Sequence, residues 1–75
     1  MKIALFMIMC SGISSDCLPP HFLNTHDTYY DCMINGYQQS IMKTEEIGAE
    51  QINEHKIYIK FVCAPEIKEE KSTWN

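Results

Sequence analysis

Arginine is absent from this 75-residue chain, and all six basic residues are lysines. Ten acidic residues outnumber them, so the formal net charge is −4. A nucleic-acid-binding protein needs a basic stripe to neutralise phosphates, and a polybasic membrane anchor needs a cluster of positive charge. We therefore expect no nucleic acid among the partners and no electrostatic attachment to a membrane.

The chain also lacks closely spaced metal ligands, catalytic motifs and internal repeats. No two cysteines have the C-x₂₋₄-C spacing of zinc sites, and the C-x-x-C of thioredoxin-like proteins is missing. No apolar run approaches the ~20 residues of a transmembrane helix. The sequence therefore predicts no metal, no cofactor, no catalytic residue and no stable membrane span, and we expect a protein that is not an enzyme.

What the chain does contain is typical of one small globular domain over residues 1–75. Hydrophobic residues make up 45% of the sequence and charged residues 21%. A chain of this size buries only ~60% of the surface that its unfolded form exposes. Small domains therefore often add disulfides, a metal or a partner chain to a marginal core.

The apolar run that follows Met1 and Lys2 has two interpretations. Its length falls within the ~7–15 residues of a signal-peptide core, so residues 1–14 could be a cleaved signal. The small residues that a cleavage site needs are hard to place there, however. A continuous apolar run ended by a stretch rich in serine also predicts a buried strand, which we place at 2–10.

The rest of the chain divides into a loop, a helix, a second strand and a tail. Glycine, serine and paired prolines indicate a loop over 11–25. Apolar residues at three- and four-residue steps predict a helix over 26–47, and Gly48 ends it because glycine tolerates positive φ. Apolar alternation predicts a strand over 56–64. The charged residues 66–75 form a loose tail.

Within this helix, Thr25 or Asp27 is the expected N-cap. Gly36 costs ~1 kcal/mol relative to alanine, so we expect it to pack closely against a strand. The apolar stripe of the helix comprises Tyr30, Met33, Ile34, Tyr37 and Ile41. The second strand is expected to place Ile57, Ile59 and Phe61 on one face and Tyr58, Lys60 and Val62 on the other.

Strand, helix and strand in this order predict a βαβ unit with parallel strands. The expected fold class is α/β, or small α+β, with one long central helix packed on a small sheet and stapled by disulfides. Two strands alone leave the first strand poorly covered. Either short strands from the loop or another chain would complete the sheet, so we expect self-association or a protein partner.

The cysteines are the most informative residues, and their even number predicts a disulfide framework: Cys10, Cys17, Cys32 and Cys63. On the parallel βαβ arrangement all four sulfurs meet at one end of the domain. Of the three possible pairings we favour Cys10–Cys63 and Cys17–Cys32. Disulfides imply an oxidising compartment: extracellular, periplasmic or the surface of a virus particle.

The alternative is an intracellular metal-binding or thiol module with a zinc or iron–sulfur site. Four cysteine thiolates can bind zinc tetrahedrally, and Cys17 with His21 or His26 could also contribute ligands. A cysteine nucleophile would need Cys17 or Cys32 to be free and ionised, which bridging prevents. A separate candidate is an interaction surface made by the aromatic residues Tyr29, Tyr30, Tyr37 and Trp74. The glutamates near the helix end indicate a solvated face: Glu45, Glu46, Glu50 and Glu54.

Three segments carry a resemblance to a group of viral proteins: MKIALFMIMCS, YYDCMINGY and INEHKIYIKFVC. Together they resemble short uncharacterised four-cysteine proteins of marine bacteriophages and viral metagenomes, over most of the chain and at all four cysteines. The resemblance implies a phage-encoded product, either a minor particle component or a protein exported by the infected host. It implies no activity. We therefore expect a small disulfide-stabilised, non-enzymatic interaction or structural protein.

Overall fold

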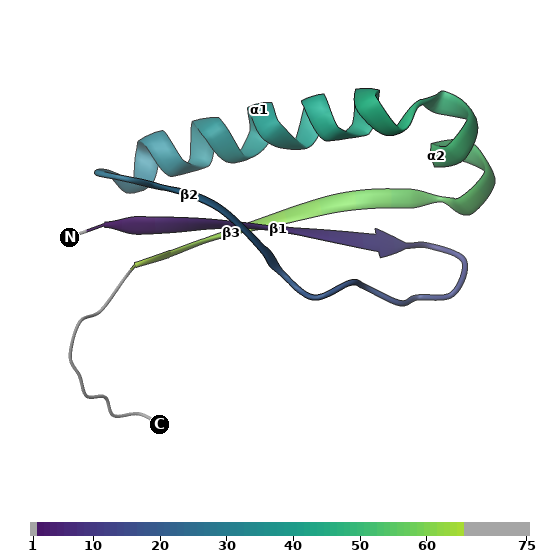
Figure 1. Cartoon of the computed structure of the whole chain (residues 1–75), viewed down its shortest axis with the longest axis horizontal. Helices are drawn as coiled ribbons and strands as arrows, with labels where there is room; N and C mark the ends of the chain where they lie inside the picture. Colours follow the sequence, from purple (N-terminus) through teal and green to yellow (C-terminus); the bar gives the residue numbers. More distant parts are fainter. Residues whose placement is uncertain (1, 66–75) are drawn as a thin grey trace.

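The computed structural model describes residues 2–65, in the order strand, strand, helix, helix, strand (Figure 1). The elements are β1 (Ile3–Ser11), β2 (His21–His26), α1 (Tyr29–Ile47), α2 (Ala49–His55) and β3 (Ile57–Pro65). The expected small α+β class, with one long helix on a small sheet and two disulfides, is confirmed. The predicted tail at 66–75 lies outside the described residues.

The sheet has the order β2-β1-β3, and both outer strands run antiparallel to the central β1. The predicted parallel pairing of the first and last strands is wrong. The reason is β2, which occupies part of the segment predicted as a loop. It returns the chain to the beginning of β1, so α1 runs toward the other end and β3 must come back against β1 (Figure 1). The strand that completes the sheet comes from this same chain.

The apolar run near the N-terminus forms β1, the central strand, and contributes most of the buried residues. Ile3, Leu5 and Met7 alternate on the face toward α1, and Leu5 is fully buried. They belong to a small core to which α1 contributes Cys32. Removal of residues 1–14 would therefore remove the strand that joins both outer strands.

The start of α1 differs from the prediction by three residues. Thr28 is the N-cap, and its Oγ1 accepts a hydrogen bond from the backbone N–H of Asp31 at 3.0 Å. Neither predicted cap serves, because Thr25 belongs to β2 and the Asp27 carboxylate pairs with Lys2 Nζ at 2.6 Å. The predicted stop is confirmed, since Gly48 follows the helix with φ of 96°.

The contact of α1 with the sheet depends on small residues. Its two buried residues are Cys32 and Gly36, and a Cβ at Gly36 would lie 2.3 Å from the ring of Phe61. The predicted close packing of this glycine against a strand is therefore confirmed. Because the backbone approaches β3 here, large side chains of the predicted apolar stripe, such as Tyr37 and Ile41, stay exposed beside the contact instead of forming the core.

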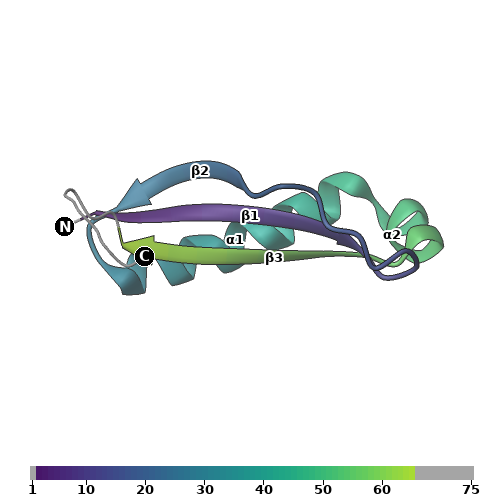
Figure 2. The same ribbon diagram turned by 90° about the horizontal axis from the view of Figure 1, so that it is seen from below.

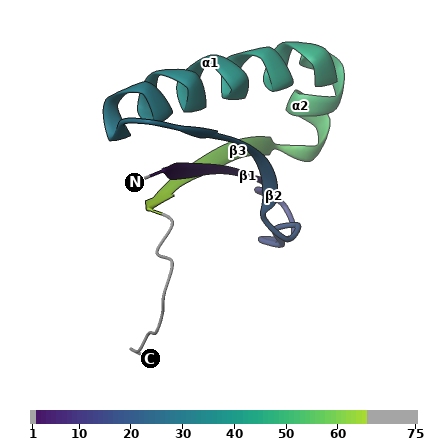
Figure 3. The ribbon, with the colours of Figure 1, turned by 60° about the vertical axis from the view of Figure 1, so that its left-hand side comes forward.

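Both helices lie on the same face of the sheet (Figure 3). In Figure 2, α1 crosses the strands obliquely, with its first turns at the β3 side and its last turns at the β2 side. No described helix or strand covers the opposite face. The alternation predicted for the second strand is confirmed: Ile57, Ile59 and Phe61 are half-buried toward the helices, and Tyr58, Lys60 and Val62 are exposed.

Candidate peptide-binding groove

Two disulfides hold opposite ends of the domain. Cys32–Cys63 joins α1 to β3, and Cys10–Cys17 joins the end of β1 to the loop that follows it. All four cysteines predicted to form disulfides do so, but the favoured pairing and the convergence at one end are wrong. Antiparallel β3 places Cys63 opposite Leu5. Cys10 lies five residues further along β1, about 17 Å away.

This pairing leaves no cysteine of the chain with a free thiol. Within residues 2–65, no group of three or more His, Cys, Asp or Glu side chains is placed to hold a metal ion. His26 instead contacts two amides: its Nε2 lies 2.9 Å from Asn24 Oδ1 and 3.3 Å from Asn35 Oδ1. Across the same residues, neither helix has the length and apolar character needed to traverse a bilayer.

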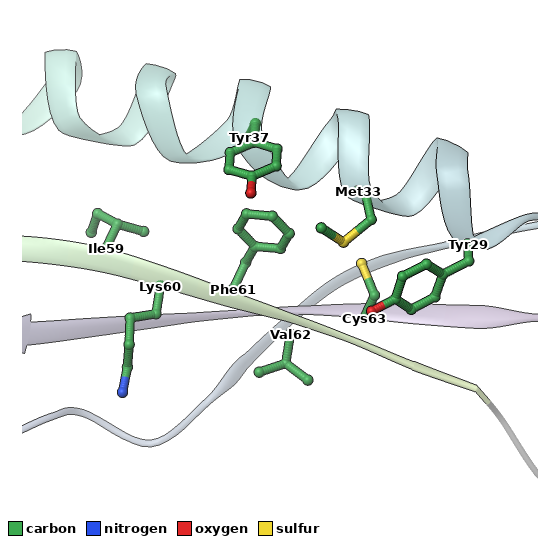
Figure 4. A pocket seen from close by; sticks show the side chains of 8 residues that line it. All are labelled: Tyr29, Met33, Tyr37, Ile59, Lys60, Phe61, Val62 and Cys63. Carbon is green, nitrogen blue, oxygen red and sulfur yellow. The ribbon is translucent and has the colours of Figure 1, made fainter.

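A groove of about 450 Å³ lies between α1 and the outer edge of β3 (Figure 4). Its lining residues are Tyr29, Met33, Tyr37, Ile59, Lys60, Phe61, Val62 and Cys63. A second hollow of about 230 Å³ shares Tyr37 and Ile59 with it and continues toward Thr44 and Glu45. The two hollows form one groove along the helix and the strand edge.

The helix wall of this groove consists of Tyr29, Met33 and Tyr37, which are four residues apart and therefore share one side of α1. Tyr29 is 55% exposed and Tyr37 59% exposed, so both rings remain accessible. Two of the four aromatic residues predicted as an interaction surface thus lie together here. Tyr30 is 72% exposed outside the groove lining, and Trp74 lies outside the described residues.

Phe61 fixes the distance between the two walls. Its ring packs over Gly36 and makes an edge-to-face contact with Tyr37, with ring centroids 4.8 Å apart. The Cys32–Cys63 disulfide joins the same helix and strand near the Tyr29 end. The helix and the strand edge therefore have a fixed spacing without a partner.

Two backbone hydrogen bonds near the end of the β1–β3 pairing show which residues of β3 direct their N–H and C=O groups toward β1. Gly12 N–H donates to the Lys56 carbonyl at 2.7 Å, which makes this a hydrogen-bonded pair of the antiparallel ladder. Such pairs alternate with pairs whose N–H and C=O groups point away from each other. Met9 and its partner Ile59 are a pair of the second kind. The Met9 carbonyl confirms this, because it accepts a hydrogen bond from Leu18 N–H on the β2 side and so points away from Ile59.

The backbone N–H and C=O groups of Ile59, Phe61 and Cys63 consequently point away from β1, at the free edge of β3. They have no backbone partner among residues 2–65. In Figure 4, the side chains of Lys60 and Val62 point away from α1. The groove therefore combines aromatic side chains with a row of unpaired main-chain groups.

Sequence reasoning missed Met33, Ile59 and Phe61 as parts of a site. Four-residue steps along α1 and two-residue steps along β3 could have identified each wall separately. That the two walls face each other depends on the strand order, which the undetected β2 determines.

No protein-family model, curated protein or solved structure matches this chain. The candidate site therefore rests on the groove itself.

Proposed function

We propose that this protein is a non-enzymatic interaction module that binds an extended segment of a partner protein by β-strand addition along β3, beneath α1. The observation that carries the proposal is the row of outward N–H and C=O groups on Ile59, Phe61 and Cys63, within an aromatic groove. The two disulfides are the staples that let so small a domain hold this groove open.

An extended main chain is the ligand that matches such an edge. The outward groups recur every two residues, about 6.7 Å apart, which is the repeat of a β-strand. Each new backbone hydrogen bond contributes about 0.5–1.5 kcal/mol net. Strand addition takes affinity from these bonds and specificity from pockets for alternate side chains. Tyr29, Met33 and Tyr37 supply an apolar wall for those side chains.

The groove also defines the chemistry of the partner segment. Apolar residues at alternate positions would face α1, and polar residues between them would face solvent. Glu45 lines the end of the groove nearest Ile59, and the chain as a whole carries a net charge of −4. A lysine or arginine at that end of the segment would complement the carboxylate.

Two disulfides fit a protein of an oxidising compartment. We place the binding role outside the cytoplasm, at a virion surface, in the periplasm or in the extracellular medium. The resemblance of the chain to short phage proteins supports a phage-encoded product that meets its partner there. The assignment to an oxidising compartment can be tested by counting free thiols in protein from its natural source, denatured without reductant. Four free thiols would contradict it.

The binding proposal is testable with two synthetic probes, acetylated Lys-Thr-Val-Thr-Val-Thr and Thr-Val-Thr-Val-Thr-Lys, in which the lysine shares the face of the valines. Their lysines approach Glu45 in parallel and antiparallel addition respectively. We expect one of them to slow amide hydrogen exchange at Ile59, Phe61 and Cys63, measured by NMR, and to leave Lys60 and Val62 unchanged. The same peptides with alternate amides N-methylated should give no protection.

Matched variants locate the binding surface. Tyr37→Ser should weaken peptide binding about tenfold or more, because truncating a central aromatic contact commonly costs over 1 kcal/mol. Tyr30→Ser replaces an exposed tyrosine of the same helix that does not line the groove, and should leave the affinity unchanged. Protection that arises without peptide and grows with protein concentration would show that a second copy occupies the edge. That result, or no protection by either peptide, would overturn the proposal.

A further inference from the structure

Three methionines and a histidine gather on the helix-covered face of the sheet, at the β2 side. A hollow of about 360 Å³ has Met7, Met9 and His21 in its lining. A second hollow, of about 210 Å³, shares Met7 and His21 with the first and adds Met42 of α1. Neither hollow has a lining residue in common with the peptide groove. We call Met7, Met9, Met42 and His21 the methionine cluster.

The strand pairing brings these side chains together. Met7 lies directly opposite His21 in the β1–β2 ladder, so both side chains project from the same face with Cβ atoms about 4.5–5.5 Å apart. Met9 follows on that face two residues along β1, about 6.7 Å away. The last turns of α1, which carry Met42, lie at the β2 side (Figure 2). A thioether side chain rotates about three bonds, so the sulfurs can reach one point beside the His21 ring.

The donor atoms of the cluster select a soft metal ion. Thioether sulfur is a ligand for Cu(I), imidazole suits copper as well, and Mg²⁺ and Ca²⁺ prefer oxygen. All four cysteines are bridged, so no thiolate competes for the ion. The expectation of no metal rested on the spacing of cysteines and did not consider thioether ligands.

We propose that the methionine cluster binds one Cu(I) ion, with Met7 Sδ and an imidazole nitrogen of His21 as the central ligands and Met9 and Met42 beside them. This site is independent of the peptide groove and would serve a separate, copper-binding role. Neutral thioethers carry no proton that the ion must displace. They also cannot be lost to disulfide formation where cysteines are oxidised.

The surroundings of the cluster favour a bound ion. Within residues 2–65 the His21 ring has no hydrogen-bond or ion-pair partner, whereas the His26 ring contacts two amides. His21 is exposed and Met42 is 59% exposed, so an ion can enter from solvent, while Met7 is buried beneath them. The one lysine in the lining, Lys43, pairs with Glu46 at 3.3 Å, and this pair adds no net charge to the site.

Two measurements on the intact, disulfide-bonded chain test the proposal. Cu(I), kept reduced with ascorbate, is titrated against the chromophoric chelator bicinchoninate, and we expect one equivalent to bind. Zn²⁺ should not compete for it. In chloride-free buffer, Ag(I) replaces Cu(I) as a soft monovalent probe without redox chemistry. NMR should then show shifts at the methyl groups of Met7, Met9 and Met42 and at the His21 ring. Met33, which lines the peptide groove, should not shift.

Matched variants identify the ligands. Met7→Leu keeps the size and apolar character of a core side chain and should stay folded. It should weaken Cu(I) binding about tenfold or more, because losing even a group that only supports a ligand commonly costs about 10–100-fold in metal affinity. His21→Gln, at an exposed position, should have a similar effect without touching the core. Met33→Leu, the same substitution in the groove, is the control and should leave Cu(I) affinity unchanged.

Circular dichroism verifies that each variant is folded, and His21→Gln alone decides the matter if Met7→Leu is not. Shifts of Met33 as large as those of the cluster, binding of Zn²⁺ as tight as that of Cu(I), or unchanged Cu(I) affinity in a folded Met7→Leu or His21→Gln variant would each overturn the proposal. Peptide binding along β3 should be the same with and without Cu(I), so the failure of either proposal leaves the other standing.

Discussion

The two edges of the sheet differ in ways that matter for binding. β2 has six residues, and its register with β1 shifts between Leu5 and Phe6. β3 has nine residues and pairs with β1 from Ile3 to Ser11 without a shift. The β2 side is also tied to the helix by polar contacts, since Asn24 Nδ2 donates to Asn35 Oδ1 at 3.3 Å. The β3 side meets the same helix through aromatic rings.

Short length and a bulge are features by which natural proteins discourage pairing at a sheet edge. β2 has both, and the regular β3 has neither. In Figure 2, the first turns of α1 lie at the β3 side of the sheet. Between this part of the helix and the free edge of β3 lies the groove lined by residues of both elements. The chain thus protects one edge and keeps the other shaped for a strand, which is the basis of the proposed function.

We expect the largest loss of stability from removing the Cys32–Cys63 disulfide, which joins α1 to β3. Cys32→Ser with Cys63→Ser opens a link across 31 residues, which should cost about 3.5–4 kcal/mol on the chain-entropy model. Cys10→Ser with Cys17→Ser opens a link across 7 residues and should cost about 2–2.5 kcal/mol. Urea unfolding of both double variants measures the difference.

Only the first of these variants should also weaken peptide binding at conditions where it is still folded, because only that disulfide joins α1 to β3. Equal losses of stability, or an intact groove without Cys32–Cys63, would contradict the role given to this bridge.

Proline substitutions at two neighbouring positions of β3 test its two edges independently, the one paired with β1 and the one that faces outward. Lys60→Pro removes an N–H that faces Ile8 in the ladder, and should destabilise the fold by about 2–3 kcal/mol. Ile59→Pro removes an outward N–H, should cost about 1 kcal/mol through its lost side chain, and should abolish peptide binding. Urea unfolding and peptide titration test both. Tight binding by Ile59→Pro would show that the outward groups are not used.

The sequence predicts each long element within about three residues, because periodicity and the stop at Gly48 are local signals. It fails at β2, since paired prolines and polar residues resemble a loop and pairing with β1 is a long-range interaction. That single omission reverses the direction of β3, and with it the disulfide pairing. The aromatic residues Tyr29 and Tyr37 were predicted as a surface from composition, whereas the groove they line depends on the strand order.

A smaller effect is expected at the closest contact of the groove. Gly36→Ala would place a Cβ 2.3 Å from the Phe61 ring, so Phe61 must move. Overpacking of this kind costs about 1–3 kcal/mol, and the better helix propensity of alanine returns about 1 kcal/mol. We expect a net loss of about 1 kcal/mol with weaker peptide binding. Gln38→Ala, at an exposed position of α1, is the control and should change neither.

The smallest change in stability is expected from the ion pair between Lys2 and Asp27 on the β2 side of the sheet, and it depends on pH. The hydrogen bond and the charge of Lys2 hold the pKa of Asp27 below its usual 3.8. Because the pKa of Asp27 is lower in the folded state, the Lys2–Asp27 pair stabilises the fold fully when the pH is above 3.8, the ordinary pKa of the group. This contribution to stability is lost as the pH falls through the lower pKa of the folded state.

Urea midpoints of wild type and Asp27→Asn should therefore differ slightly at neutral pH and converge in strong acid. High salt should reduce the difference at neutral pH, because both side chains are exposed. Peptide binding along β3 should be the same in both proteins, since this pair ties the turn after β2 to the start of β1. A change in peptide affinity on replacing Asp27 would mean that the two edges of the sheet are not independent.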